Sequence, residues 1–163
     1  MNARSWLRLS AKAIHDIASI GFGGGLVACL VINLTANRAS ASEFATARHL
    51  FAAIAQYALI PSMAVVVVSG LIAMAATRGY QDAGWAWVKA VLGISVFVGT
   101  VRLVGAGGAQ ADLAAAAIVT AADAGVLDAA LRSERNMLWL LIALCVVNVV
   151  LAVWRPRMMM TVR

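Results

Sequence analysis

Four long apolar runs constrain the fold of this chain more than any other feature of its sequence. They lie at about residues 14–36, 50–77, 85–104 and 137–154. A helix that crosses a bilayer needs about 20 residues at a rise of about 1.5 Å each, and all four runs are close to or above that length. None alternates polar and apolar residues, as the strands of a membrane barrel do. The sequence therefore predicts the all-α class: a four-helix integral membrane bundle forming a single transmembrane domain over residues 1–163.

Composition agrees with this class. Hydrophobic residues make up 63% of the chain and charged residues only 12%, whereas soluble domains are less apolar and carry about twice that share of charge. The tryptophans lie near the ends of the runs, as aromatic residues at a membrane–water interface do; they are Trp6, Trp85, Trp87, Trp139 and Trp154.

The positive charges are distributed unevenly between the two ends of the runs. One side receives Arg4, Arg8, Lys12, Arg78, Arg155, Arg157 and Arg163, and the other receives Arg38, Arg48, Arg132, Arg135 and most of the acidic residues. This bias predicts that both termini are cytoplasmic and that the chain is a multi-pass protein of a bacterial inner membrane. The net charge of +6 is then a topology signal and an attraction to anionic membrane lipids, and nucleic-acid binding is not expected.

Two local features interrupt the simple pattern of four spans. Pro61 lies inside the second run and predicts a tilt or kink there. Before the fourth run, residues 109–135 are rich in alanine, with Gly125 as a break, and predict one or two short helices in an outer loop. That loop is either a lid over a site or only a long connector.

His15 is the residue of greatest functional interest. At about 100° per residue it shares one face of the first run with Ser19, Phe22 and Asn33, and Gly25 lies beside that face. A histidine inside a membrane span is a candidate site residue by default, although it can also be an interfacial residue bonded to a carbonyl group. The glycines permit close approach either of another helix or of a flat ligand.

Lys89 lies about one turn inside the third run and is predicted to occupy the same layer as His15. It either extends to the interface or binds a ligand carboxylate such as a haem propionate. Asp16 can form a salt bridge in this layer, and Met74 is the best-placed sulfur atom for a second axial bond to a haem iron. His49 lies at the opposite side of the membrane, so it cannot share one haem with His15, and its role is open.

Several short motifs resemble a known group of membrane proteins. They are K-A-x-H in "KAIH", the Gly25–Leu26 pair, P-x-M in "PSM", the tryptophans before Lys89 in "WAWVK", and the arginines before Asn136 in "RSERN". The pattern resembles the superfamily of small four-helix proteins that includes HemJ-type protoporphyrinogen oxidases, the CopD-like copper-resistance domain and the DUF2269 integral membrane family. The resemblance implies that His15 ligates a b-type haem and that Lys89 is needed for activity.

The function expected from these observations is membrane redox chemistry with haem b, related to protoporphyrinogen oxidation. His15 is the expected metal ligand and, with Lys89, the expected catalytic pair; the remaining cofactor contacts are assigned to Asp16, Ser19, Phe22, Gly25 and Met74. Two alternatives stay open. The chain is a non-catalytic subunit or assembly factor that contacts other membrane subunits or a second copy of itself, or it is a CopD-like copper-handling protein.

Overall fold

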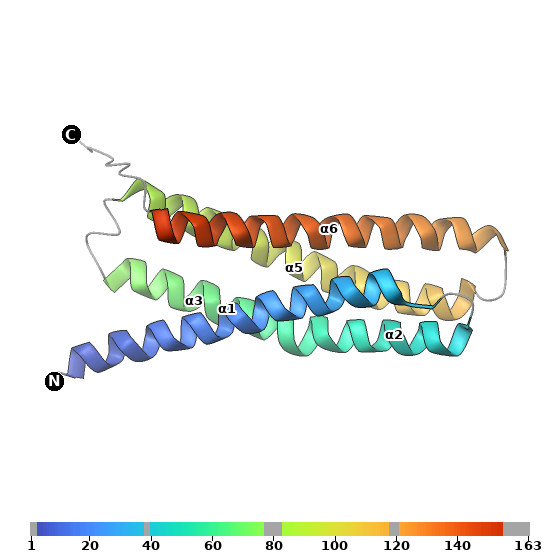
Figure 1. The fold of residues 1–163 in the computed structure, drawn as a ribbon, viewed down its shortest axis with the longest axis horizontal. Helices are drawn as coiled ribbons and strands as arrows, with labels where there is room; N and C mark the ends of the chain where they lie inside the picture. The colour runs from blue at the N-terminus through green and yellow to red at the C-terminus, as the bar shows by residue number, and fades with distance from the viewer. Residues whose placement is uncertain (1–2, 38–39, 77–82, 118–120, 155–163) are drawn as a thin grey trace.

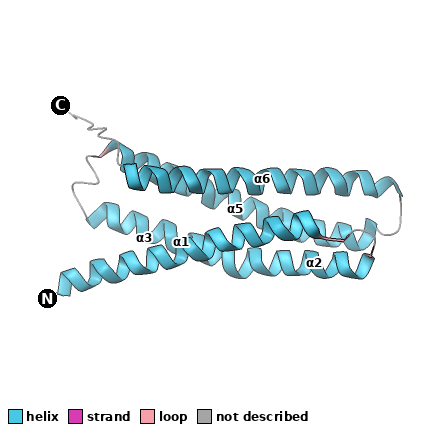
Figure 2. Ribbon diagram, viewed as in Figure 1, coloured by secondary structure: helices cyan, strands magenta, loops and turns pink. Residues whose placement is uncertain are grey.

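The computed structural model describes the backbone of residues 3–37, 40–76, 83–117 and 121–154, and within these ranges it leaves the side chains of residues 3–5, 7–8, 41, 106–117 and 121–124 undescribed. The described elements are helices (Figures 1 and 2). In chain order they are α1 (Ala3–Thr35), α2 (Ala41–Ile54), the π-helical turn η1 (Ala55–Leu59), α3 (Ile60–Ala76), α5 (Gly84–Ala117) and α6 (Ala121–Trp154).

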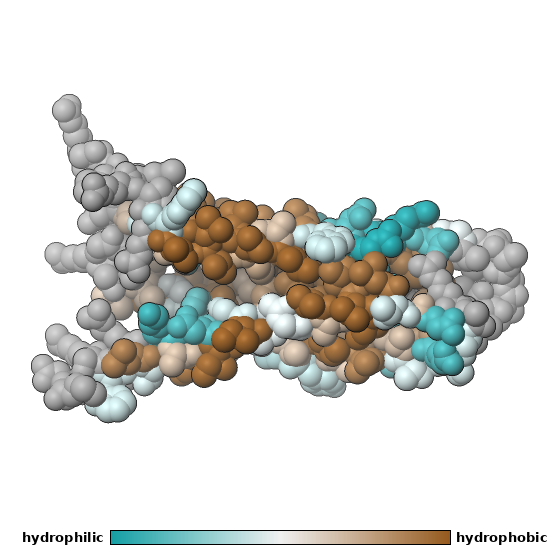
Figure 3. Space-filling view, in the orientation of Figure 1, coloured by the Kyte–Doolittle hydropathy of each residue, from teal (hydrophilic) through white to brown (hydrophobic). Residues whose placement is uncertain are grey.

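Four stretches of these helices are long and apolar enough to cross a membrane. They are Leu9–Thr35, Ser42–Ala76, Gly84–Gly105 and Gly125–Trp154. The prediction of an all-α four-helix bundle with four membrane-length helices is confirmed, and the chain is a multi-pass membrane protein. Figure 3 shows apolar side chains over much of the length of the bundle and polar side chains gathered toward its two ends.

The helices extend well beyond the apolar runs that predicted them. α1 starts at Ala3 rather than about residue 14, and α2 starts at Ala41 rather than about residue 50. The start of α2 is a capping arrangement that the apolar pattern does not report, since the Glu43 amide donates to the Ser40 side chain at 3.4 Å. Hydropathy detects only the part of a helix that lies in lipid, whereas caps and helix propensity fix where the helix ends.

The second span is interrupted where Pro61 predicts an interruption. The π-helical turn Ala55–Leu59 precedes the proline, and the Ile60 amide donates to the Ala55 carbonyl five residues earlier. Proline removes a backbone donor and crowds the preceding turn, and a π turn is one way for a helix to absorb that change. The two parts of this span run in visibly different directions (Figure 1).

The described residues of the alanine-rich segment, 109–117 and 121–135, are helical, but they belong to long helices rather than to separate short ones; residues 118–120 lie outside the described part of the chain. α5 continues to Ala117 and α6 begins at Ala121, so most of the predicted outer loop belongs to the two long helices. Alanine has the highest helix propensity of all residues and does not stop a helix that is already formed. Gly125 lies inside the first turns of α6 and does not break that helix.

The four spans are packed in a ring. α1 packs against the α2–η1–α3 span and against α6, and α5 packs against the other side of the same two neighbours. α1 and α5 are therefore diagonally opposite across the bundle axis, and so are the α2–η1–α3 span and α6. This arrangement decides which side chains can meet in the centre.

Burial divides the bundle into two halves. The packed half contains α1 from Phe22 onward, α2, η1, α3 up to Met63, α5 from Val96 and α6 up to Leu141. Its core consists of Phe22, Leu26, Cys29, Leu30, Phe51, Ala55, Leu59, Met63, Val96, Leu103, Leu138 and Leu141.

The open half contains the remaining parts of the same four spans, at the end of the bundle that holds the N-terminus (Figure 1). Among its residues of described exposure, only Gly84 and Ala86 are buried. In Figure 3 the surface is hollowed at this end between α6 and α1. Since inward-facing side chains here are only half-buried, the helices leave room between them that the packed half does not have.

Candidate functional site in the open half

His15 and Lys89 lie at the same level of the bundle. Asn33 of α1 contacts Leu131 and Glu134 of α6, and His15 precedes Asn33 by 18 residues, or five helical turns. Gly99 of α5 faces Leu141 of α6, and Lys89 precedes Gly99 by ten residues. Counting 18 residues along α6 from the Asn33 contact, and ten residues from the Gly99 contact, places both side chains at the level of about residue 151. The predicted common layer of His15 and Lys89 therefore agrees with the register of the helices.

The ring of His15 is held by α3. Its Nδ1 lies 2.8 Å from Ser69 Oγ, and the Ser69 hydroxyl lies 2.6 Å from the Val65 carbonyl oxygen. A hydroxyl carries one proton, and when that proton is donated to the carbonyl, Oγ accepts from the imidazole. His15 then carries its proton on Nδ1, and Nε2 keeps a lone pair that can bind a metal or accept a hydrogen bond.

Small residues leave space on one side of the ring. A Cβ atom added at Gly70 would lie 3.8 Å from His15 Cε1, so a side chain there would touch the imidazole and the glycine leaves that space unfilled. Ser69 and Gly70 thus hold the ring on the α3 side, and the ring remains half-buried.

Two charged residues act on His15. Lys89 and Asp16 are both close enough for their charges to interact with the imidazole. Lys89 lies on the same face of α5 as Thr100, which is fully buried and eleven residues further along, so it is directed toward the bundle interior. Lys89 is half-buried, whereas Asp16 is exposed on the neighbouring face of α1.

The other predicted cofactor contacts are spread along the bundle. Ser19 is exposed and donates to the His15 carbonyl oxygen at 2.8 Å, so its hydroxyl is already engaged within its own helix. Phe22 is a core residue of the packed half. Met74 is half-buried on α3, five residues beyond Ser69 and more than one turn nearer the helix end than the level of His15.

The glycines of α1 serve helix packing at two positions. A Cβ atom at Gly25 would lie 2.7 Å from Leu59 Cδ2, and one at Gly21 would lie 3.2 Å from Ser62 Oγ. These two glycines allow α1 to approach the α2–η1–α3 span closely, which is one of the two interpretations that the sequence left open. A Cβ atom at Gly23 or Gly24 would meet nothing within 4 Å.

Two grooves lie on the seam between α1 and α3 in the open half. One has a volume of about 390 Å³ and is lined by residues that include Ile14, Val68 and Ser69. The other has a volume of about 310 Å³ and is lined by residues that include Ile17, Pro61 and Ser62. The walls of both grooves are mostly apolar, and such walls suit contact with lipid chains.

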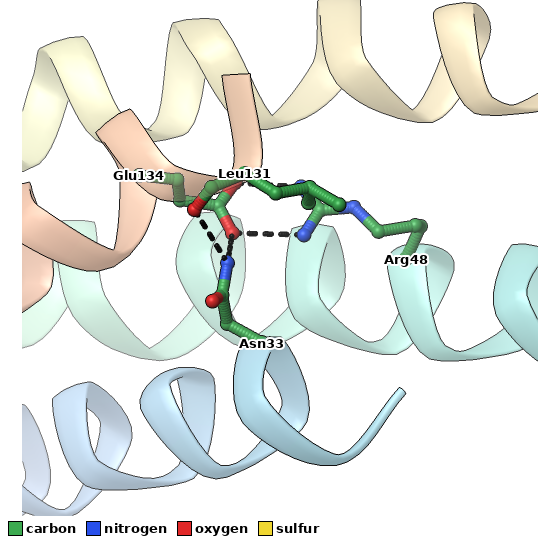
Figure 4. Close-up of polar contacts among 4 residues, drawn as sticks. All are labelled: Asn33, Arg48, Leu131 and Glu134. Carbon is green, nitrogen blue, oxygen red and sulfur yellow. Dashed lines mark hydrogen bonds and ion pairs between the residues drawn. The ribbon is translucent and has the colours of Figure 1, made fainter. Parts of the chain in front are cut away.

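A buried polar cluster in the packed half is absent from the sequence-based predictions. Arg48 and Glu134 form a bidentate ion pair in which Nη1 donates to Oε1 at 2.8 Å and Nη2 donates to Oε2 at 2.7 Å (Figure 4). Asn33 Nδ2 donates to the same Oε1 at 2.7 Å and to the Leu131 carbonyl oxygen at 3.3 Å. The Arg48 guanidinium also lies 4.5 Å from the centre of the Phe51 ring.

This cluster connects two diagonally opposite spans. Arg48 comes from α2 and Glu134 from α6, and their side chains are 1% and 0% exposed, so they meet at the bundle axis. By its charge and position in the sequence, Arg48 is only one of the residues that predict topology. The sequence contains one signal for the burial of Glu134, which is helical spacing. Glu134 lies four and seven residues before the buried Leu138 and Leu141 and therefore shares their face of α6.

Within the residues that the structure describes, no group of three or more His, Cys, Asp or Glu side chains is placed to hold a metal ion. A site of the CopD-like copper-handling type therefore gains no support from the described side chains. A haem iron is held by its macrocycle and needs only axial protein ligands, so His15 alone meets its minimum requirement.

Comparisons with known proteins add no further constraint: no family model, no curated protein sequence and no solved structure matches this chain.

Proposed function

We propose that the open half of the bundle binds b-type haem through His15 and that the protein works in membrane redox chemistry. The observation that carries this proposal is the hydrogen bond between His15 Nδ1 and Ser69 Oγ at 2.8 Å. Histidines that ligate metals usually donate their other ring N–H to a protein acceptor, which fixes the ring and its tautomer. His15 has such a partner and keeps Nε2 for an axial bond.

Each residue of the layer has a role in the proposal. Ser69 orients the imidazole, and Lys89 supplies a cation for an acidic group of the ligand such as a propionate. When bound, the haem would supply one-electron transfer. The same proposal includes a bacterial inner membrane with both termini in the cytoplasm. It also includes kinship with the HemJ-like, CopD-like and DUF2269 group. Because of that kinship, porphyrinogen oxidation is the first reaction to assay.

The first test is the visible absorption spectrum of protein purified from haem-sufficient cells, oxidised and then reduced with dithionite. The wild type should show a Soret band that shifts on reduction, and His15→Ala should lose it. His49→Ala is the matched control, because His49 is exposed on α2 in the packed half. A colourless wild type, or a band that persists in His15→Ala, would contradict the proposal.

Ser69→Ala tests the hydrogen bond itself. The loss of a partner that orients a metal ligand commonly lowers metal affinity by about 10- to 100-fold. We expect Ser69→Ala to bind haem more weakly than the wild type by a factor in this range, with the same spectral type. Ser95→Ala is a suitable control, since Ser95 donates only to the carbonyl oxygen of Val91 in its own helix.

A colourless wild type would favour the second candidate function, a subunit or assembly factor of a larger membrane complex. That function predicts that the chain copurifies with other membrane proteins from mild detergent. An isolated homogeneous chain without cofactor or partner would contradict both candidates.

A further inference from the structure

In the part of the chain that the structure describes, Asn148 presents a buried hydrogen-bond acceptor that receives no bond. Its Oδ1 atom is buried, and no donor in the described part of the chain reaches it. Buried side-chain oxygens are almost always satisfied by protein or by water, because an unmade hydrogen bond is costly in an apolar environment. An acceptor of this kind inside a membrane bundle indicates a missing donor.

The Asn148 side chain is directed into the bundle rather than toward lipid. It lies seven residues after Leu141 and 14 residues after Glu134, on the same face of α6, and both of those side chains are buried at the centre of the packed half. The neighbouring residues Val147 and Val149 are exposed on the outer faces of α6. Asn148 therefore continues the central face of α6 into the open half.

Space for a ligand lies opposite Asn148. Counted from the contact between Gly99 and Leu141, Gly93 of α5 is level with Asn148. Gly93 is seven residues before the buried Thr100 and shares its inward face, and a Cβ atom at Gly93 would meet nothing within 4 Å. On α1 the residue at this level is Ala18, which is also small. The missing side chain at Gly93 leaves open space at this level, about one turn deeper than His15 and Lys89.

The surroundings define the chemistry of that molecule. The hollow between α1 and α6 lies within the membrane-length part of both helices (Figure 3), and α1 exposes large apolar side chains in this part of its length, such as Ile17 and Ile20. A ligand that enters this way must be lipid-soluble, and to satisfy Oδ1 it must carry an O–H or N–H donor.

We propose that the open half binds a lipid-soluble hydroquinone, one of whose ring hydroxyls donates a hydrogen bond to Asn148 Oδ1. A hydroquinone is flat, partitions into membranes, carries the required donor and is a common electron carrier. The inference deepens the proposed function by naming the class of redox partner, and it rests on that function for the choice of a redox-active ring over other hydroxylated lipids.

The test uses the full chain in lipid nanodiscs, prepared without haem, so that its outcome is independent of the haem spectrum of His15→Ala. The probes are decylbenzohydroquinone under anaerobic conditions and its dimethyl ether, which lacks the donor, with affinities measured by titration calorimetry. The wild type should bind the hydroquinone at least tenfold more tightly than the ether, because the ether leaves the buried oxygen unsatisfied. Asn148→Leu and Asn148→Ala should lose this preference, whereas Asn136→Leu, at an exposed asparagine of α6, should keep it.

Thermal unfolding of the ligand-free variants provides the second measurement. Asn148→Leu should raise the Tm, because it replaces an unsatisfied polar group by an apolar group of similar size. A lower Tm would show that Asn148 makes a structural hydrogen bond and would overturn the inference. Equal wild-type affinity for the two probes would overturn it too, and tighter binding of dioctanoylglycerol than of the hydroquinone would assign the site to a lipid hydroxyl instead.

Discussion

The two halves of the bundle contain the same four spans but place different kinds of side chain at the central axis. In the packed half a diagonal is closed by the Arg48–Glu134 ion pair, with Asn33 and a continuous apolar core around it. In the open half the other diagonal brings His15 and Lys89 to one level, and the residues between the helices are small or half-buried. From this difference we infer that the packed half stabilises the fold and that the open half has room for a ligand.

A site in a membrane bundle needs such a division. Hydrophobic burial gives no driving force between helices in lipid, so packing and interhelical hydrogen bonds must hold the helices together. The packed half contains both the tight packing and the interhelical hydrogen bonds of the Arg48–Glu134 cluster. The open half can then keep a polar atom such as Asn148 Oδ1 without a partner among the described residues, because its geometry is fixed from the other end.

The comparison is most sharply tested by breaking the ion pair. Arg48→Met should lower the free energy of unfolding by about 3–5 kcal/mol, because it leaves the Glu134 carboxylate buried without its counter-charge. The double variant with Glu134→Leu should recover most of that loss, since a well-packed apolar pair often replaces a buried ion pair at little cost. SDS titration in detergent micelles measures both, with Arg132→Met at an exposed position as control. A change of less than about 1 kcal/mol in the single variant would mean that the pair does not hold this half together.

Asn33→Ala should have the next largest effect. The variant removes a 2.7 Å hydrogen bond to the Glu134 carboxylate, and bonds to charged groups contribute about 1.5–3 kcal/mol. The same titration measures the loss, and the effect should largely vanish in the background of Arg48→Met with Glu134→Leu. Additive effects in the two backgrounds would contradict a single coupled cluster.

Glycine substitutions compare the packing of α1 at two nearby positions. Gly25→Ala should destabilise the protein by about 1–2 kcal/mol, because its Cβ atom would lie 2.7 Å from Cδ2 of the fully buried Leu59. Gly23→Ala should be neutral or stabilising by up to about 1 kcal/mol, because the added atom meets nothing within 4 Å and alanine favours the helix. Equal effects at both positions would show that the close approach of α1 to η1 is not present in the membrane.

The smallest expected loss of stability is that of His15→Ala in the open half. The variant removes one hydrogen bond, to Ser69, and should cost about 0.5–1.5 kcal/mol in the haem-free protein, although it should abolish haem binding. Thermal unfolding of haem-free wild type and variant, run beside their spectra, separates the two consequences. A loss comparable to that of Arg48→Met would make His15 a structural residue and remove the contrast between the halves.

The sequence by itself determined the class of the protein and much of the candidate layer. Apolar runs of about 20 residues can satisfy their backbone groups in lipid only as helices, so four spans follow directly from hydropathy. The interruption near Pro61 follows from a missing backbone donor, and the common level of His15 and Lys89 follows from their depth along two spans that run in the same direction.

Only the tertiary structure decided which residues meet at the axis. The Arg48–Glu134 pair joins positions 86 residues apart on diagonally opposite spans, and nothing local in either segment selects that partner. The structure likewise decided that Ser69 contacts His15, that Gly25 accommodates Leu59, and that Asn148 Oδ1 is buried without a hydrogen bond among the described residues. Hydropathy fixes how deep each residue lies in the membrane, but the order and rotation of the helices depend on packing between them, which a sequence pattern along one helix does not contain.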